Sequence, residues 1–422
     1  MVRIYSEVYG CSSNTADQEI VLGLLKKAGF GITNAIENSD MVIIFTCTVK
    51  SPTVNRMIYK IKEFTKLDKP MIIAGCMPKT EKRVIENINP KASMLGPNSI
   101  EKIVEIAKLT LKDKKTIFTE DLKKPKLCLP RVRKNPIINI TPISSGCLSN
   151  CSYCSVKFAR GKLFSYPIEM IVNEVKNSIK DGCKEIWLTS QDNGCYGFDM
   201  GMRLAELLRK ICEIDGKFLV RVGMMNPLHT RKILDDLIKV YKNEKIFKFL
   251  HLPVESGSDK ILDLMKRGYK VKDFINIVRK FRKDIPNLTL STDIIVRFPS
   301  ETERDFRKTI ELIEKIRPDI VNISKFGSRP RTEAAKMKQL DRNIVNKRSP
   351  ILHKLVKKIA LEKNKKWITW KGEVLVDEIG INHSFVGRNF AYKPVVVRTN
   401  EKIFGKFVEV KIKDVTENFL IC

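Results

Sequence analysis

The sequence predicts an α/β protein with three parts: an N-terminal parallel-sheet α/β domain, a central partial (β/α)6 barrel and a small C-terminal β-barrel. Three observations predict this architecture. The 422 residues exceed what one ordinary core supports. Short apolar runs alternate with helix-length segments over most of the chain. Only the last segment, 367–422, changes to short β-type runs separated by glycines.

Residues 1–111 are expected to form the first domain, because strand-like and helix-like segments alternate there. Buried strands are predicted at the apolar runs Arg3–Val8, Met41–Thr46 and Met71–Gly75. Helices are predicted between them, at Thr15–Ala28 and Thr53–Thr65. The charged, proline-containing segment 112–136 that follows is predicted to be a linker.

Residues 137–366 contain six successive strand–helix units. The predicted strands are Ile137–Ile143, Glu185–Ser190, Phe218–Met224, Phe247–Val254, Leu288–Arg297 and Ile320–Lys325. Sequential βα units build a parallel sheet, open or closed, and reactive groups gather at the carboxyl ends of its strands. A very basic helical extension is predicted at Asp341–Lys366.

The C-terminal segment 367–422 has the size and rhythm of a five-stranded barrel of the kind that binds RNA. Its strand candidates are Glu373–Asp377, Phe385–Val386, Val395–Arg398 and Lys406–Ile412.

The net charge is +30, from 78 Lys and Arg against 48 Asp and Glu. Such an excess attracts a polyanion and indicates nucleic acid, although a lysine-rich proteome from an AT-rich or heat-adapted organism would also give it. No stretch approaches a membrane helix and the start lacks a signal-peptide core, so we expect a cytoplasmic protein without a membrane partner. In that reducing compartment, eleven cysteines favour metal ligands over disulfides.

Cys147, Cys151 and Cys154 form a Cys-x3-Cys-x2-Cys motif directly after the first barrel strand. Three thiolates can hold three irons of a cubane cluster and leave the fourth iron open for a substrate. A zinc site is the alternative, but it needs a fourth ligand, and the nearest histidine in the sequence is His229. Three unrelated buried cysteines are the other alternative.

Cys11, Cys47 and Cys76 each follow one of the three predicted strands of the first domain. Since the carboxyl ends of parallel strands meet at one edge of a sheet, the three thiols are expected to converge. They would hold a second cluster with its own open iron. The alternative is that small, apolar cysteines simply fill buried strands.

These six cysteines, in this order and followed by a small β-domain, resemble the radical S-adenosylmethionine (SAM) methylthiotransferase family over essentially the whole chain. The segments Cys-Ser-Tyr-Cys-Ser-Val-Lys-Phe-Ala-Arg-Gly-Lys, Glu-Ile-Trp-Leu-Thr-Ser-Gln-Asp-Asn-Gly and Arg-Val-Gly-Met-Met-Asn-Pro are similar to the branch that acts on N6-threonylcarbamoyladenosine in tRNA. The resemblance implies a methylthiotransferase N-terminal domain, a radical-SAM domain and a C-terminal TRAM domain.

The resemblance also implies a transferase with two 4Fe-4S clusters and SAM. The Cys147, Cys151 and Cys154 cluster would reduce SAM to a 5′-deoxyadenosyl radical, and the other cluster would carry the sulfur. A second SAM would supply the methyl group. The product would be the 2-methylthio derivative of the adenosine next to the anticodon, at position 37 of the tRNA anticodon loop. Flavodoxin or ferredoxin would donate electrons; the sulfur donor stays open.

Polar residues at strand ends are candidates for binding SAM and substrate. For the cofactor these are Ser190, Gln191, Glu255, Ser256 and Asp293. For the substrate, an arginine suits the threonylcarbamoyl carboxylate. Arg221 is the first choice, with a structural ion pair to Glu255 as the alternative, and Arg160, Arg297 and Arg329 or Arg331 are the other candidates. Glu255 stands where the family often has glutamine, and Arg297 and Ser300 replace glycines of a Gly-Phe-Pro-Gly pattern, which leaves the SAM contacts there open.

Other functions stay open at this point. A related enzyme would modify isopentenyladenosine in tRNA, and another would attack an aspartate of a ribosomal protein. The positive charge favours RNA over a basic ribosomal protein, because two cationic partners repel each other. A protein of another class would be a non-catalytic iron–sulfur sensor that binds RNA and does not cleave SAM.

Overall fold

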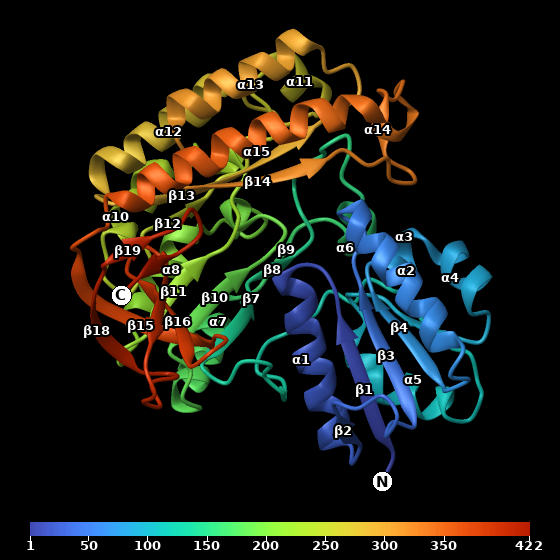
Figure 1. The fold of residues 1–422 in the computed structure, drawn as a ribbon. Coiled ribbons are helices and arrows are strands. Elements are labelled where there is room, and N and C mark those ends of the chain that lie inside the picture. Colours follow the sequence, from blue (N-terminus) through green and yellow to red (C-terminus); the bar gives the residue numbers. More distant parts are fainter.

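The computed structural model describes residues 1–422, except for the side chain of Arg342. An N-terminal α/β domain lies beside a central sheet that is wrapped by helices, and a curled C-terminal sheet packs against the central part (Figure 1). This mixed α/β architecture confirms the predicted fold class. None of the helices in the described residues combines the length and apolar character that crossing a bilayer requires.

The N-terminal domain is a six-stranded parallel sheet in the order β2-β1-β3-β4-β5-β6. Its strands are β1 (Arg3–Val8), β2 (Gly31–Thr33), β3 (Met41–Thr46), β4 (Met71–Gly75), β5 (Ser93–Leu95) and β6 (Ile117–Phe118). Its helices are α1 (Ser12–Lys27), α2 (Ser51–Thr65), α3 (Met77–Thr80), α4 (Lys82–Ile88), η1 (Ile100–Lys102) and α5 (Ile103–Thr110). All three predicted strands occur with the predicted bounds. The sequence missed β2, β5 and β6, which are too short to show a pattern.

The central part has two parallel three-stranded sheets, β7-β10-β11 and β12-β13-β14, joined by a bridge between Val220 and Ile246. The strands are β7 (Ile138–Pro142), β10 (Glu185–Thr189), β11 (Leu219–Val222), β12 (Phe249–His251), β13 (Thr289–Val296) and β14 (Ile320–Lys325). A short hairpin, β8 (Ser144–Ser145) with β9 (Phe164–Ser165), follows β7. Six parallel strands in two connected sheets match the predicted partial barrel.

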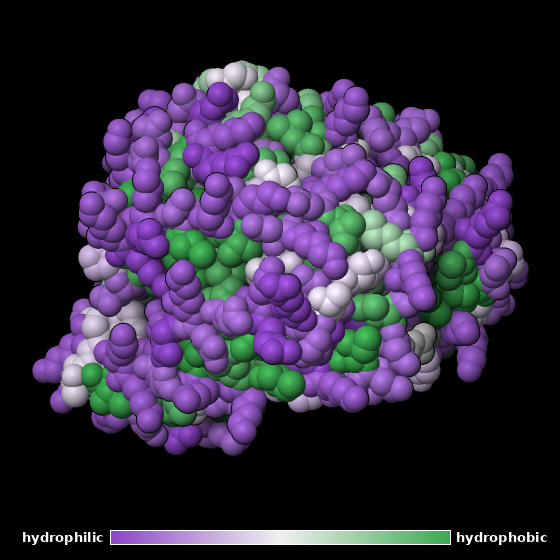
Figure 2. All heavy atoms as spheres, turned by 90° about the horizontal axis from the view of Figure 1, so that it is seen from above, coloured by the Kyte–Doolittle hydropathy of each residue, from purple (hydrophilic) through white to green (hydrophobic). Residues whose placement is uncertain are grey.

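Helices cover the outer face of this barrel, and the buried residues of α7, α8, α10, α12, α13 and α15 contribute to its main core. The helices of this part of the chain are α6 (Val156–Arg160), α7 (Ile168–Lys180), η2 (Asn193–Cys195), α8 (Leu204–Cys212), α9 (Pro227–Thr230), α10 (Leu234–Tyr241), α11 (Asp259–Leu264), α12 (Val271–Asp284), α13 (Glu303–Ile316), α14 (Glu333–Lys336) and α15 (Arg342–Lys365). Figure 2 shows that the face carrying α12, α13 and α15 is mostly hydrophilic.

The C-terminal sheet has six strands in the order β18-β15-β16-β17-β20-β19, rather than the five that we expected. They are β15 (Lys371–Ile379), β16 (Ser384–Asn389), β17 (Pro394–Arg398), β18 (Phe407–Lys411), β19 (Asp414–Val415) and β20 (Leu420–Ile421). The sheet is fixed to the barrel by a buried ion pair between Lys393 Nζ and Asp319 at 2.9 Å, and the backbone nitrogen of Lys248 donates to the Phe390 carbonyl.

The N-terminal domain also contacts the barrel directly. Helix α1 packs on β7, and the hydroxyls of Ser12 and Thr189 are 2.7 Å apart. The hydroxyl of Ser155, in the loop after Cys154, bonds to Thr48, which follows Cys47. These contacts bring the two cysteine triplets to the same side of the molecule.

Candidate active site

The three cysteines of the barrel motif lie on the loop between β8 and α6, at the carboxyl end of the barrel sheet. Ser152 anchors this loop: its backbone nitrogen donates to the Met265 carbonyl and its hydroxyl to the Leu264 carbonyl. The backbone nitrogen of Cys147 donates to the Gly161 carbonyl. The loop is therefore held from both sides, which fixes where its thiols lie.

The three thiols of this loop have different electrostatic surroundings. Burial raises the pKa of the Cys154 thiol to about 12. Burial also raises the pKa of Cys151, against the opposing charge of Arg267. The pKa of Cys147 is instead lowered to about 7, chiefly by the neighbouring Cys195, whose thiol donates to the Asp192 carbonyl at 3.2 Å. The backbone nitrogen of Ser149 donates to the same sulfur at 3.3 Å.

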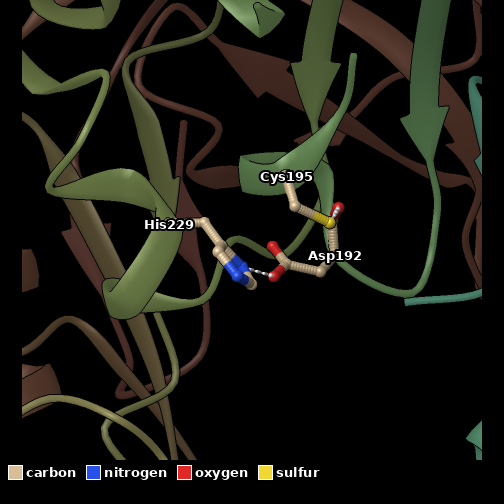
Figure 3. Close-up of side chains that lie close together, drawn as sticks. All are labelled: Asp192, Cys195 and His229. Carbon is tan, nitrogen blue, oxygen red and sulfur yellow. Dashed lines mark hydrogen bonds and ion pairs between the residues drawn. The ribbon is translucent and has the colours of Figure 1, made fainter. Parts of the chain in front are cut away.

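Cys195 lies with Asp192 and His229 in a buried group beside Cys147 (Figure 3). In the described residues this is the one set of three metal-ligand side chains whose ligand atoms all lie within 4.8 Å of one another. The Asp192 carboxylate is already engaged, since one oxygen contacts His229 Nδ1 at 2.6 Å and the other accepts the backbone nitrogens of Gly194 and Asn226. The group thus has internal hydrogen bonds that explain the position of Asp192 without a metal.

Arg267 is a buried cation that contacts the same cysteine loop. Its guanidinium donates to Cys151 Sγ at 3.2 Å and to the Tyr153 hydroxyl at 3.3 Å. It also lies 3.9 Å from the Glu255 carboxylate. A guanidinium in this position offsets the negative charge of the thiolates and fixes the orientation of Cys151.

The structure brings Cys11, Cys47 and Cys76 together at the carboxyl ends of β1, β3 and β4. Burial raises the pKa of Cys47 to about 12, and the neighbouring Cys11 and Cys76 thiols raise it further. Gly10 allows this approach: a Cβ on it would lie 2.9 Å from the Cys47 sulfur. The three thiols therefore converge, as their positions at the ends of parallel strands predict.

Arg160 lies beside this second triplet and is almost fully buried. Its guanidinium donates to Asp17 at 2.9 Å and to Asn14 at 3.0 Å. Its charge also acts on the Cys76 thiol, whose pKa is raised by burial although this neighbouring charge lowers it. Lys126 completes the group, since its ammonium contacts both Asp17 and the Pro97 carbonyl.

The spacing of the thiols separates a cluster from a zinc site. Sulfurs around one zinc lie within about 4.6 Å of one another, twice a Zn–S bond of about 2.3 Å. In neither cysteine triplet of the described residues do all three sulfurs come within 4.8 Å of one another. Both triplets therefore fit a multi-iron cluster with three cysteine ligands better than they fit a single zinc ion.

A cavity of about 400 Å³ opens next to both triplets. Cys154 lines it from the barrel loop, and Val49 and Lys50, which follow Cys47, line it from the N-terminal domain. Its remaining polar lining comes from the ends of the last three barrel strands and the segments after them: His251, Glu255, Asp293, Asn322, Ser324, Lys325 and Arg329. A cavity of this size with convergent polar groups suits a small cofactor and a substrate group.

The cavity contains a hydrogen-bonded network of side chains. His251 Nε2 lies 3.2 Å from both oxygens of Asp293, and Asn322 donates to the same carboxylate at 2.7 Å. These bonds lower the pKa of Asp293 although burial opposes the shift. Higher in the cavity, Glu255 accepts a hydrogen bond from Tyr153 at 2.9 Å, and burial raises its pKa to about 7.

The five residues predicted for cofactor binding occupy three different places. Glu255 and Asp293 line the cavity. Ser256 is buried and its hydroxyl accepts the backbone nitrogen of Ser258, so it has a structural partner. Ser190 Oγ and Gln191 Oε1 are buried at the end of β10 without a hydrogen-bond partner in the described residues. Such orphaned polar atoms fit a bound ligand or water, which is the state expected of a cofactor site.

Arg297 and Ser300 take the left-handed backbone conformation that glycine favours, with φ of 67° at both. Side chains are strained there, and Arg297 is held by bonds from its guanidinium to the carbonyls of Leu340 and Phe326. Glu255 also has a positive φ, of 69°. Both residues thus adopt a backbone conformation in which glycine would be unstrained, and the Arg297 side chain ties two loops together.

The two arginines predicted for substrate binding have other partners. The burial of Arg160 beside Asp17 leaves it no open side toward an RNA. Arg221 lies between the rings of Trp187, Phe249 and Tyr392, 5.1 to 5.4 Å from each ring centre. Because Tyr392 belongs to the C-terminal sheet, Arg221 lies at the junction of two domains and not among the cavity-lining residues.

Sequence reasoning missed Arg267 and left Cys195 without a role. Neither has a local signal, since Arg267 is 116 residues away from Cys151 in the chain. Cys195 does follow a predicted strand end, as the other site cysteines do. That shared position was the one feature of the sequence that could have indicated it.

Comparison with protein families gives matches to all three parts of the chain. Residues 141–313 match the Radical SAM superfamily, residues 3–96 match Uncharacterized protein family UPF0004, and residues 372–421 match the TRAM domain. Among solved structures, the chain resembles the radical SAM methyltransferase TsrM from Kitasatospora setae, with a TM-score of 0.59 at 14% identity over 79% of this chain and 77% of that one. This likeness shows the shared fold. The fold and the cysteine loop thus define a radical-SAM protein.

Relatives that match along the full chain show which family within the radical-SAM superfamily this chain belongs to. A probable threonylcarbamoyladenosine tRNA methylthiotransferase of Pyrococcus horikoshii is 43% identical over 100% of this chain and 99% of its own length. The Methanocaldococcus jannaschii protein of the same name is 44% identical over 98% and 95%. The human threonylcarbamoyladenosine tRNA methylthiotransferase is 36% identical over 99% and 73%. The chain belongs to the threonylcarbamoyladenosine tRNA methylthiotransferase family.

Proposed function

We propose that this protein converts N6-threonylcarbamoyladenosine at position 37 of tRNA to its 2-methylthio derivative. The observation that carries the proposal is a cavity that has a cysteine of the barrel triplet on one wall and the segment directly after Cys47 on another. Cys154 lines it, and the Val49–Lys50 segment that follows Cys47 forms its opposite wall. One adenine ring placed there would lie within reach of both metal centres, which radical formation and sulfur transfer at a single carbon require.

The six cysteines would hold two 4Fe-4S clusters, and the orphaned polar atoms of Ser190 and Gln191 together with Glu255 and Asp293 would bind SAM. When bound, these cofactors supply the radical, the sulfur and the methyl group that acid–base side chains cannot provide. The protein's own part is to position the cofactors and the substrate and to exclude water from the cavity. Tyr153 and Arg267 hold Glu255, while His251 and Asn322 hold Asp293 at the cavity wall.

Two lysines of the cavity are suited to the substrate's carboxylate. Lys50 and Lys325 line the cavity and are exposed to solvent. Arg329 also lines it, but its guanidinium donates to the Val49 carbonyl and the Ser51 hydroxyl. We therefore assign recognition of the threonylcarbamoyl carboxylate to Lys50 and Lys325 instead of Arg160 and Arg221.

The division of the chain into 1–111, 112–136, 137–366 and 367–422 belongs to the same proposal. So do a cytoplasmic location and a one-electron donor such as flavodoxin or ferredoxin. The enzyme would need such a donor because its own side chains supply no electrons at the potential of a cluster.

Mass spectrometry of tRNA nucleosides tests the activity directly. Cells that lack the protein and then regain it should lose and recover the 2-methylthio form of threonylcarbamoyladenosine. A 2-methylthio form of isopentenyladenosine that follows the protein instead would overturn the substrate assignment and leave the radical chemistry standing.

The substrate contact has its own test. Lys50→Met with Lys325→Met should lower kcat/KM on threonylcarbamoylated tRNA by roughly tenfold or more, the loss of a charge-assisted contact. Activity on tRNA that lacks only the threonylcarbamoyl group should change little. Arg221→Met is the matched control, and it should leave the ratio of the two substrates unchanged. A ratio that changes only with Arg221→Met would contradict our assignment.

A further inference from the structure

The positive charge of this protein is unevenly distributed. Residues 372–421, which match the TRAM domain, contain seven basic and seven acidic residues and therefore no net charge. Residues 342–366, directly before them, contain nine Lys and Arg and one Glu. A C-terminal domain that binds RNA would be expected to carry part of the positive charge, but the surplus lies instead on α15, on the linker 112–136 and on the central domain.

Four lysines of α15 form one straight row along the helix. Lys347, Lys354, Lys358 and Lys365 follow one another at intervals of seven, four and seven residues. At 3.6 residues per turn these intervals place all four within about 20° of one line on the helix surface, over a length of about 27 Å. All four side chains are exposed. We call this row the lysine stripe.

Other basic residues of α15 are paired with acids, and the lysine stripe is not. Arg348 contacts Glu301 at 2.7 Å, and Lys357 contacts Glu417 at 3.2 Å. The one acid of the helix, Glu362, is paired with Arg317. Within the described residues, no carboxylate forms an ion pair with any lysine of the stripe.

An unpaired row of this kind is unfavourable for the helix itself. Lys354 and Lys358 are like charges at a spacing of four residues, which destabilises a helix by a few tenths of a kcal/mol. The neighbouring surface helix α13 mixes both signs instead, with four Glu or Asp among its fourteen residues. A solvated surface helix has no need to collect one sign, whereas a helix that binds a polyanion does.

The position of α15 connects the cavity with the C-terminal domain. The helix packs along β14, whose last residue, Lys325, lines the cavity. Its other end is tied to the C-terminal sheet, where Asn364 donates to the Thr416 carbonyl. In Figure 1 the helix crosses the molecule from α14 to the C-terminal strands. A nucleic acid with one base in the cavity would therefore pass along α15.

We propose that the lysine stripe of α15 binds the phosphate backbone of the tRNA whose modified base enters the cavity. This inference rests on the proposed function for the identity of the RNA. The stripe supplies sequence-independent affinity and orients the anticodon arm, while the neutral C-terminal domain contributes contacts of another kind.

The test replaces the four lysines of the stripe by glutamine, which keeps helix propensity and removes the charge. The variant is Lys347→Gln, Lys354→Gln, Lys358→Gln and Lys365→Gln in the full-length reconstituted protein. Affinity for threonylcarbamoylated tRNA is measured over a range of salt concentrations. Each lost phosphate contact reduces the slope of log affinity against log salt by about 0.7 to 0.9, so the slope should flatten by about three.

A matched control removes the same charge elsewhere. Lys176, Lys180, Lys272 and Lys283 are exposed lysines of α7 and α12, and they form no ion pair within the described part of the chain. Replacing these four by glutamine should change the slope by less than one. If both quadruple variants changed the salt slope equally, the slope would depend only on net charge. This result would refute the proposed role of the lysine stripe.

Two further measurements separate the possible failures. SAM cleavage in the absence of RNA should be the same in the stripe variant and in the wild-type protein, which shows that the fold and the clusters are intact. A wild-type protein that binds tRNA with the steep salt dependence but does not modify it would refute the proposed function and leave the stripe standing. If the stripe variant kept the wild-type salt slope, tRNA binding by the lysine stripe would be refuted and the proposed methylthiotransferase activity would not be affected.

Discussion

Cys147, Cys151 and Cys154 lie on one short loop, whereas Cys11, Cys47 and Cys76 lie at the ends of three separate strands. The loop triplet is defined by local spacing, and the strand-end triplet exists only when the sheet has formed. Both nevertheless have a buried arginine at one sulfur: Arg267 at Cys151 and Arg160 at Cys76. The two triplets differ in backbone structure, but in each of them a buried arginine offsets the negative charge of the three thiolates.

The triplets differ in one further contact. Cys195 lies beside Cys147 and lowers its pKa, and within the described residues no thiol from outside the strand-end triplet affects the pKa of Cys47 or Cys76 in this way. Hydrogen bonds to the sulfurs tune the potential of a cluster. The loop triplet is therefore adjusted by an additional neighbour, as suits a centre that must deliver an electron to a bound cofactor.

The largest effect should come from removing either triplet. The wild-type protein should hold about eight irons in two cubane clusters, and each triple alanine variant should hold half. Loss of Cys147, Cys151 and Cys154 should also abolish SAM cleavage. Loss of Cys11, Cys47 and Cys76 should preserve cleavage and abolish methylthiolation. Iron analysis and chromatography of 5′-deoxyadenosine check this. A full iron content in the variant that lacks Cys11, Cys47 and Cys76 would show that these cysteines do not hold a cluster.

The two arginines should act each on its own cluster. Arg160→Gln should weaken iron retention by the strand-end triplet by roughly ten- to a hundredfold, and Arg267→Gln should do the same for the loop triplet. Iron loss to a mild chelator is measured in the triple alanine backgrounds, where one cluster is present at a time. Lysine at either position should restore part of the retention. If each arginine affected both clusters equally, the cause would be general destabilisation.

A smaller effect is expected from replacing Cys195, which should change the midpoint potential of the loop cluster and not that of the strand-end cluster. Cys195→Ala removes the polar neighbour of Cys147 and should lower the midpoint potential of the loop cluster by roughly a few tens of millivolts. Cys195→Ser keeps a polar group at this position and should restore the potential. Spectroscopic redox titration of both variants checks this. A shift in the strand-end cluster instead would show that the contact seen in the structure is not the cause.

The smallest effect should lie away from both triplets, at the junction with the C-terminal sheet. Burial raises the pKa of Glu185 to about 8, and the nearby Asp377 adds to the shift. A carboxyl with a raised pKa stabilises the folded protein fully below its usual pKa near 4.5, and this stability is lost as pH rises to about 8.

Glu185→Gln should therefore make the protein up to a few kcal/mol more stable than wild type at pH values above about 8, with little difference near pH 5. Chemical unfolding of the reconstituted protein at several pH values measures this. Iron content should not change in the variant. A greater stability gain at acid pH than at alkaline pH would contradict the burial of a protonated Glu185.

Much of the fold was predictable because it depends on local patterns. Met41–Thr46 is a run of six residues that are all buried in β3, and its apolar sequence is sufficient to predict a strand of those bounds. By contrast, β5 has three residues and β6 has two, and such strands form only because a neighbouring strand offers hydrogen bonds. The C-terminal sheet gained its sixth strand for the same reason.

Local patterns in the sequence are enough to predict the strand–helix order, the pattern of six cysteines and the family to which the chain belongs. The places where the charges act depend on tertiary packing. Arg160 looks like part of a basic loop, yet it pairs with Asp17, 143 residues away. Spacing and periodicity are properties of neighbouring residues, so a sequence displays them. The partner of a buried charge is chosen by how separate elements pack, and low dielectric then makes that one contact decisive.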